Sequence, residues 1–236
     1  MRIPLAREGT KEMLIALVVS TAWALLSWLV GLPILGVAGA LLLSAVLMFF
    51  RDPNREIPAE PGLIVSAADG RVTLIQHVDK HPLVSGPAVR ISVFLSVANV
   101  HVNRAPCSGR VIDKEIREGL YLDARDPECA DKNASCTMTL APDKPFAGPI
   151  VVRQLTGKIA RRIVCNAGLG DRLARGEKFG MIKFGSRTDV IVPQQPGLEV
   201  LVKVGDKVRG GTTVLMKMVQ PKVQDSPVEP VATAVV

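Results

Sequence analysis

The most constraining feature of the chain is a run of 38 residues, Met13–Phe50, that contains no Asp, Glu, Lys or Arg. A single straight helix of this length would extend about 57 Å, almost twice the roughly 30 Å of a bilayer's hydrocarbon core. Gly31 and Pro33, near the midpoint, are residues that loosen and interrupt a helix. The run therefore predicts a transmembrane hairpin of two helices, Met13–Val30 and Pro33–Phe50.

Basic residues flank both open ends of this hairpin, namely Arg2, Arg7, Lys11, Arg51 and Arg55. The positive-inside rule then places both ends in the cytoplasm. Residues 1–50 are thus expected to anchor the chain in the inner membrane, with residues 51–236 on the cytoplasmic face. A signal peptide is the alternative, but its apolar region has only roughly 7–15 residues. Because each half is near the minimum spanning length, a hairpin that only dips into the bilayer stays open.

Residues 51–218 are expected to form a mainly β (α+β) domain. Apolar residues alternate there with more polar neighbours, the period of half-buried strands, as in Val89–Leu95 and Cys136–Leu140. No long pattern of helical period is present. Residues 219–236 are rich in Pro and Val without a period, which predicts a flexible tail.

Composition excludes several classes of protein. With 48% hydrophobic residues the chain is too apolar to be disordered. Four cysteines, none in Cys-x-x-Cys spacing, do not make a disulfide scaffold, and reduced thiols are expected. Aromatic residues are only 4% of the chain, so the stacking surface of single-strand binders is missing and no nucleic-acid partner is expected.

One internal repeat is informative. The segment Gly170–Gly176 recurs 35 residues later as Gly205–Gly211, and each copy lies between two apolar stretches. Two strand, Gly-Asp turn, strand units of this kind resemble the barrel-sandwich hybrid of biotinyl and lipoyl domains. Those domains carry a modified lysine between the repeats, whereas this chain has Gly185-Ser186 there, in what is expected to be an exposed turn. Met216-Lys217-Met218 is similar to a biotin-acceptor tripeptide but follows the second repeat.

Five stretches, in order along residues 51–190, resemble phosphatidylserine decarboxylase proenzymes of the short bacterial and archaeal branch. They are Arg51–Pro58, Ser66–Gly70, Phe94-Leu95-Ser96 followed by Asn99–Pro106, Ile159–Val164 and Phe179–Arg187. The resemblance implies self-cleavage between Gly185 and Ser186, giving a β subunit of residues 1–185 and an α subunit of residues 186–236. Ser186 would become a covalent pyruvoyl group that forms a Schiff base with the substrate, and no metal is expected.

The resemblance also implies roles for other residues. His101 matches a histidine linked to decarboxylation and is the candidate for proton transfer, since histidine titrates near neutral pH. Asp69 matches an acidic partner in self-processing. Arg104 stands where the longer branch has a second histidine, so the base that activates Ser186 is left open. Arg104 and Arg187 are candidates for binding the lipid phosphate or carboxylate.

The expected partners are phosphatidylserine in an anionic membrane, the two subunits of the cleaved chain, and further copies in a homo-oligomer. The product would be phosphatidylethanolamine. Two alternatives stay open at this point: a membrane-anchored biotinyl or lipoyl-like carrier, modified on Lys217, and an adaptor domain of an export system.

Overall fold

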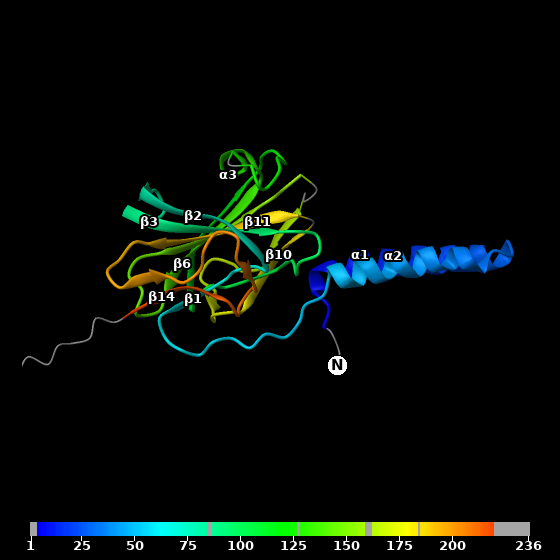
Figure 1. Cartoon of the computed structure of the whole chain (residues 1–236), viewed down its shortest axis with the longest axis horizontal. Coiled ribbons are helices and arrows are strands. Elements are labelled where there is room, and N and C mark those ends of the chain that lie inside the picture. The colour runs from blue at the N-terminus through cyan, green and yellow to red at the C-terminus, as the bar shows by residue number, and fades with distance from the viewer. Residues whose placement is uncertain (1–3, 85, 127, 159–161, 184, 220–236) are drawn as a thin grey trace, which may run out of the picture.

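A computed structural model gives the arrangement of residues 4–84, 86–126, 128–158, 162–183 and 185–219. An N-terminal helical hairpin projects from one end of a β domain (Figure 1). The prediction of a mainly β domain preceded by apolar helices is confirmed. Of the expected tail, residues 220–236 lie outside the described residues, as do Arg2 and the segment 159–161 of one motif.

The hairpin consists of helix α1, Thr10–Leu29, and helix α2, Gly36–Phe49, with short 3-10 turns at Arg7–Gly9 and Pro33–Leu35. The first helix begins earlier than predicted because Lys11 and Glu12 are good helix formers. The second helix begins later because Pro33 starts a 3-10 turn. Trp23 Nε1 donates to Leu35 O at 2.8 Å and ties the two helices together.

Most large apolar side chains of the hairpin are exposed, including Val18, Trp28, Leu29, Ile34 and Leu41. Within the described ranges, Arg7–Leu29 is the one helix long and apolar enough to cross a membrane, and Pro33–Phe49 is a shorter apolar helix. An apolar surface of this extent in water is unfavourable and indicates a lipid or protein environment.

The β domain has three sheets. The large sheet has the order β13-β2-β3-β11-β7-β6-β5-β9, and the two small sheets have the orders β1-β14-β12 and β4-β10-β8. The strands of the large sheet are β2 Gly70–His81, β3 Gly86–Leu95, β5 Gly109–Arg117, β6 Ser135–Pro142, β7 Ile150–Leu155, β9 Arg172–Leu173, β11 Ser186–Pro193 and β13 Lys207–Val208. Those of the small sheets are β1 Leu63–Val65, β4 Val102–Arg104, β8 Arg162–Cys165, β10 Lys178–Lys183, β12 Leu198–Val200 and β14 Val214–Met218. A short helix, α3, spans Cys129–Lys132.

The sheet orders reveal an internal duplication. From each edge of the large sheet inward the strands correspond, β13-β2-β3-β11 on one side and β9-β5-β6-β7 on the other, and the two small sheets correspond as well. Strands β4 to β10 therefore form a second half, inserted between β3 and β11 of the first. The sequence repeat is part of this duplication, but its copies lie at opposite edges of the sheet, in β9 and β13, rather than in one hairpin unit.

Equivalent hydrogen bonds hold the two Gly-Asp turns. Asp171 accepts from Gly168 N at 2.8 Å, and Asp206 accepts from Lys203 N at 2.9 Å. Gly170 and Gly205 both have positive φ, 88° and 98°, which glycine adopts without strain. The repeated Gly-Asp pair predicts a turn in each copy, and the structure has a turn at both positions.

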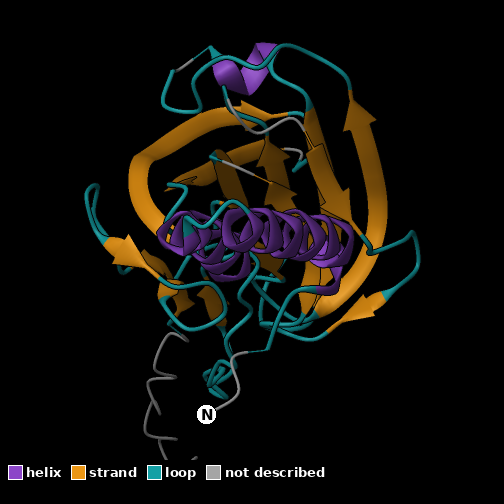
Figure 2. Cartoon of the chain, turned by 90° about the vertical axis from the view of Figure 1, so that its right-hand side faces the viewer, coloured by secondary structure: helices purple, strands orange, loops and turns teal. Residues whose placement is uncertain are grey.

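The curled sheet surrounds a core of Val, Ile, Leu and Met side chains, and the end-on view shows the strands bending around this interior (Figure 2). The alternating residues of β3 and β6 point into it: Val89, Ile91, Val93, Leu95, Met138 and Leu140 are all buried. A smaller cluster at the base of the hairpin joins Phe49 and Phe50 to Val100, Val102 and Met181.

We expect Asp171→Ala and Asp206→Ala to cost similar free energies of unfolding, about 1 kcal/mol each, because each removes one carboxylate bond to a turn N–H. For a domain of this size that lowers Tm by about 2–4 °C. Thermal unfolding of the detergent-solubilised chain measures both. A loss at one turn alone would contradict the equivalence of the two halves.

Candidate active site

Ser186 is the first residue of β11, a strand in the middle of the large sheet. It pairs with Leu95 of β3, and the next residue pairs with both Phe94 and Leu155. Ser186 is fully buried, which corrects the expectation of an exposed turn, and only Gly185 before it is half-buried. The strand is buried because β3 and β7 pair with both its edges and apolar clusters cover both its faces, with Val190 in the main core and Ile191 in a second cluster. Among the described residues, the Ser186 Oγ has no hydrogen-bond partner.

Gly185 adopts a φ of 66°, in the left-handed region that favours glycine. The backbone of Gly157 approaches its carbonyl closely, and a Cβ built on Gly157 would lie 2.3 Å from Gly185 O. Only a glycine at position 157 therefore fits against the carbonyl of the Gly185–Ser186 bond. No sequence pattern pointed to Gly157, because this contact joins two loops far apart in the chain.

His101 lies next to the same bond. The Gly185 N–H donates to His101 Nε2 at 3.4 Å, and His101 Nδ1 lies 2.9 Å from Asn99 O. Because a carbonyl oxygen can only accept, Nδ1 carries the proton, and the lone pair of Nε2 faces Gly185. The pairing of Val102 with Met181 in β4 and β10 brings these two segments together.

The imidazole of His101 is fully buried. Burial lowers its pKa to about 4; the hydrogen bond to Asn99 opposes this shift and the charge of Arg51 adds to it. His101 is thus a neutral base at physiological pH, and the lone pair of its Nε2, which accepts the Gly185 N–H, is directed at the chain segment that precedes Ser186.

Three buried polar side chains extend the site inward from Ser186. Asn103 Nδ2 donates to Thr188 Oγ1 at 3.0 Å, and Gln154 Nε2 donates to Asn103 Oδ1 at 2.8 Å. Thr188 lies opposite Gln154 across β11 and β7, on the same face as Ser186. Sequence reasoning missed this network, although polar residues at inward positions of apolar strands are its signal.

Asp69 lies outside this group in the described structure. Its carboxylate bonds to Arg55 at 2.7 Å and accepts from Gly210 N at 2.8 Å. Neither His101 nor Ser186 is among its described hydrogen-bond partners. A role for Asp69 in self-processing stays a prediction. Its contacts join the segment that follows α2, at Arg55, to the turn that follows β13, at Gly210.

Arg104 and Arg187 are both buried in ion pairs. Arg104 donates to Asp52 at 3.0 Å and to Gly176 O at 3.0 Å, and Asp52 also binds Lys178. Arg187 bonds to both oxygens of Asp189, at 2.6 and 3.0 Å. Burial lowers the pKa of Arg187 but Asp189 outweighs this, so the net pKa is raised. Lipid binding by these arginines stays a prediction, since the charge of each is already matched by a buried carboxylate.

The remaining histidines and cysteines lie elsewhere. His77 Nδ1 lies 3.1 Å from Gln194 Oε1, and His81 Nδ1 accepts from Leu83 N at 3.3 Å. Across the described ranges there is no group of three or more His, Cys, Asp or Glu side chains that could hold a metal ion. All four cysteines are free thiols.

Comparison with known proteins places this geometry in context. A family model described as phosphatidylserine decarboxylase matches residues 42–216. The chain is 41% identical to the phosphatidylserine decarboxylase proenzyme of Rhodopirellula baltica over 218 residues, 92% of this chain and 90% of that protein. It is 41% identical to the proenzyme of Symbiobacterium thermophilum over 223 residues, 93% and 99% of the two chains. For that of Trichlorobacter lovleyi the identity is 44% over 178 residues, 75% and 78%.

We expect Arg187→Leu to lower the free energy of unfolding by about 3–5 kcal/mol, because it leaves the buried Asp189 carboxylate without a partner. The double variant Arg187→Leu/Asp189→Leu should recover most of this loss. Unfolding is compared in the Ser186→Ala background, so that the self-cleavage expected from the sequence cannot interfere. A stable Arg187→Leu chain would instead favour a role in ligand binding.

Proposed function

Because the chain belongs to the phosphatidylserine decarboxylase family and is therefore a decarboxylase, we propose that it converts phosphatidylserine to phosphatidylethanolamine with a pyruvoyl group made from Ser186. The observation that carries the proposal is the juxtaposition of the buried Ser186 Oγ, the Gly185 carbonyl against Gly157, and the Nε2 lone pair of His101 beside Gly185.

Self-cleavage would begin with attack of Ser186 Oγ on the Gly185 carbonyl carbon. His101 is the neutral base beside this bond, which supports it as the acceptor of the hydroxyl proton in a chain with Arg104 in place of a second histidine. The amide becomes an ester, and the freed amino group takes up a proton. Loss of the Ser186 α-proton then forms the Cα=Cβ double bond as the Cβ–Oγ bond breaks, releasing Gly185 as a carboxylate and leaving dehydroalanine. Water converts this to a pyruvoyl cap and ammonia.

The residues present fit such a group. Ser186 has a buried oxygen with no hydrogen-bond partner among the described residues, and Gly185, just outside β11, has no side chain that must move when the bond breaks. A pyruvoyl ketone supplies an acceptor for the electron pair that decarboxylation of an amino acid leaves behind. His101 is placed to hold or return a proton at the head of β11, and the Asn103–Thr188–Gln154 network keeps the inner wall ordered.

The two products of cleavage would stay together. The α subunit, residues 186–236, contains β11, and this strand is paired on both edges with β3 and β7 of the β subunit. Strand β14 is likewise paired with β1. The homo-oligomer expected from the sequence is a further part of the proposal, and its interface is left open.

We further propose that the hairpin holds this site at the cytoplasmic face of the inner membrane. Helix α1 has 20 residues, about 30 Å, which suits a bilayer core. Helix α2 with its 3-10 turn is shorter, so that spanning needs tilt or local thinning of the bilayer. Arg51 follows α2, and a cation near an anionic leaflet adds roughly 1 kcal/mol of attraction.

The carrier and adaptor alternatives gain no support from the fold. Lys217, the lysine that a carrier would modify, lies within β14 opposite Leu63 and pairs with Glu60 at 3.4 Å. A carrier lysine stands at the tip of a hairpin turn, where a modifying enzyme can reach it.

We expect the purified wild-type chain to give two bands on a denaturing gel, and Ser186→Ala to give a single band at the uncut mass of 25.3 kDa. Mass spectrometry of the smaller fragment should show a pyruvoyl cap, which blocks Edman degradation. Phosphatidylserine in vesicles should lose CO₂ only with the cleaved protein. An intact wild-type chain that still decarboxylates the lipid would rule out the mechanism.

We expect Gly157→Ala to slow self-cleavage about 100-fold. The added Cβ would push the Gly185 carbonyl away from the attacking Ser186 Oγ, and a misplacement of about 1 Å lowers a reaction rate by about this factor. Gly86→Ala is the matched control, since nothing lies within 4 Å of its added Cβ. The ratio of cut to uncut chain over time measures both. Equal rates in the two variants would contradict the assigned position of the scissile bond.

A further inference from the structure

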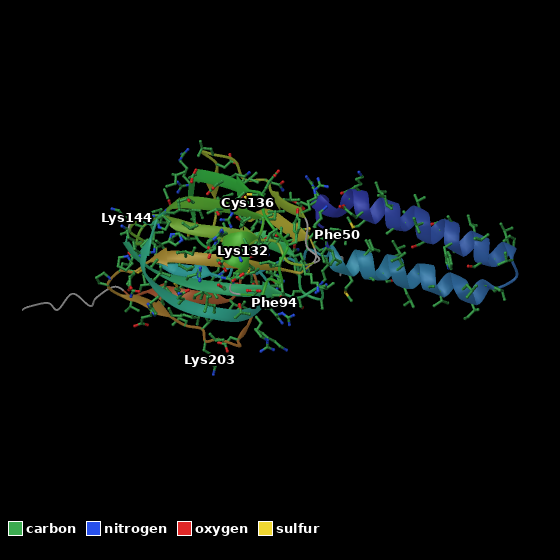
Figure 3. All side chains as sticks on the ribbon, turned by 90° about the horizontal axis from the view of Figure 1, so that it is seen from above. Phe50, Phe94, Lys132, Cys136, Lys144 and Lys203 are labelled. Atoms are coloured by element: carbon green, nitrogen blue, oxygen red, sulfur yellow. The ribbon has the colours of Figure 1, made fainter. Side chains whose placement is uncertain are left out.

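The hairpin does not simply hang from the β domain; its base is packed into it. Phe49, the last residue of α2, and Phe50 are both buried, and they contact Val100, Val102 and Met181 around the junction. In the side-chain view Phe50 lies where the hairpin meets the β domain (Figure 3). Its ring leaves no room for a side chain at Gly9, where an added Cβ would lie 2.1 Å from Phe50 Cδ1.

Polar contacts on two sides fix this base. Arg51 donates to Ala98 O at 2.6 Å, in the loop that leads to His101. Lys183, in the strand that leads to the scissile bond, donates to Glu8 O at 2.9 Å and to Glu12 Oε1 at 2.5 Å. The base of the hairpin therefore hydrogen-bonds to both chain segments that meet at the site, the loop before His101 and the end of β10.

The contact of greatest consequence is between Phe49 and His101. Their ring centroids are 4.3 Å apart with an angle of 34° between the planes, a close but tilted form of stacking. Phe49 also meets Phe50 edge to face, with their ring centroids 4.9 Å apart. The ring of Phe49 thus covers one face of the imidazole whose Nε2 faces Gly185.

We propose that Phe49 is a positioning residue of the active site, so that the membrane anchor itself supplies the wall that orients His101 and keeps it dry. This inference rests on the proposed function for the importance of His101, but the stacking and its effect on the imidazole do not depend on cleavage. A helix that enters the bilayer is thereby joined directly to the base of the reaction.

The charges around the His101 imidazole, together with its burial, decide in which direction its pKa changes when the Phe49 ring is removed. Arg51, which follows α2, disfavours the imidazolium, and burial disfavours it more strongly. Lys183 lies over the Phe50 ring at 5.6 Å and is matched by Glu12, so that this pair adds little net charge. With the Phe49 ring removed, water reaches the imidazole, the cost of charging it falls, and the pKa of His101 rises from about 4 toward its ordinary 6.5.

Histidine titration by NMR tests this directly. The full chain carries Ser186→Ala, is labelled at histidine and is held in detergent micelles; it has only three histidines, and His101→Asn assigns the signal of interest. We expect adding Phe49→Ala to raise the imidazolium fraction of His101 at pH 5.5 from roughly a few per cent to more than half. Phe49→Leu keeps an apolar side chain and is the second variant if the alanine variant folds poorly. Its titration midpoint for His101 should lie between those of the wild type and Phe49→Ala.

Phe50→Leu is the control for loosened docking, since Phe50 packs in the same cluster; it should leave the midpoint of His101 low. A low midpoint in both Phe49 variants would overturn the proposal. So would a rise in Phe50→Leu as large as that in Phe49→Ala, because general docking would then explain the effect.

Self-cleavage gives a second readout with Ser186 restored. A base that is neutral above its pKa works equally well from pH 5.5 to 7.5 in the wild type, whereas Phe49→Ala should cleave about tenfold more slowly at pH 5.5 than at pH 7.5. Chain made by cell-free synthesis with vesicles and shifted to each pH is followed on gels. If the wild type stays uncut, the proposed function fails while the titration still decides the role of Phe49.

Discussion

The pairing of β11 on both edges is the constraint on which the site depends. Its hydrogen bonds to β3 and β7 fix the backbone of Ser186 at the first position of a central strand, with the Oγ in the interior. Gly185, immediately before it, is free of the sheet and adopts a positive φ. The Gly185–Ser186 bond therefore lies at the border between a strand and a turn, with Ser186 held by the sheet and the Gly185 carbonyl packed against Gly157.

The internal duplication explains why His101 meets this bond. The second half of the domain, β4 to β10, is inserted into the first, so the chain crosses between the halves twice, just before β4 and just after β10. Because β4 and β10 are antiparallel neighbours, the two crossings lie side by side. His101 is at one crossing and Gly185 at the other, and both are gripped by the base of the hairpin through Arg51 and Lys183. The candidate site thus lies at the seam between the two corresponding halves of the domain, next to the base of the apolar hairpin.

The buried charges show why a net charge of +7 says little about individual residues. Arg104, Arg187 and Lys183 have the residue types expected for binding an anionic head group, yet each is buried beside a carboxylate of the same chain. Breaking such a pair is costly because it leaves one desolvated charge, which makes these residues supports of the site's geometry. A sequence pattern cannot distinguish them, because the partners Asp52 and Glu12 are more than 50 residues away from Arg104 and Lys183.

The sequence by itself determined the features that depend on local order. The uncharged run with its Gly and Pro break predicted the hairpin. The alternation of apolar residues predicted the inward-facing side chains of β3 and β6. The two Gly-Asp turns indicated an internal repeat, but not that the two halves of the domain correspond strand by strand. The Gly185-Ser186 pair and His101 followed from ordered motifs. Only the tertiary structure decided that Ser186 is buried, that Gly157 lies against the Gly185 carbonyl, that Asp69 bonds to Arg55, and that the Phe49 ring packs against His101. These relations join segments far apart in the chain, and they are set by strand pairing and close packing, which no local pattern of residues encodes.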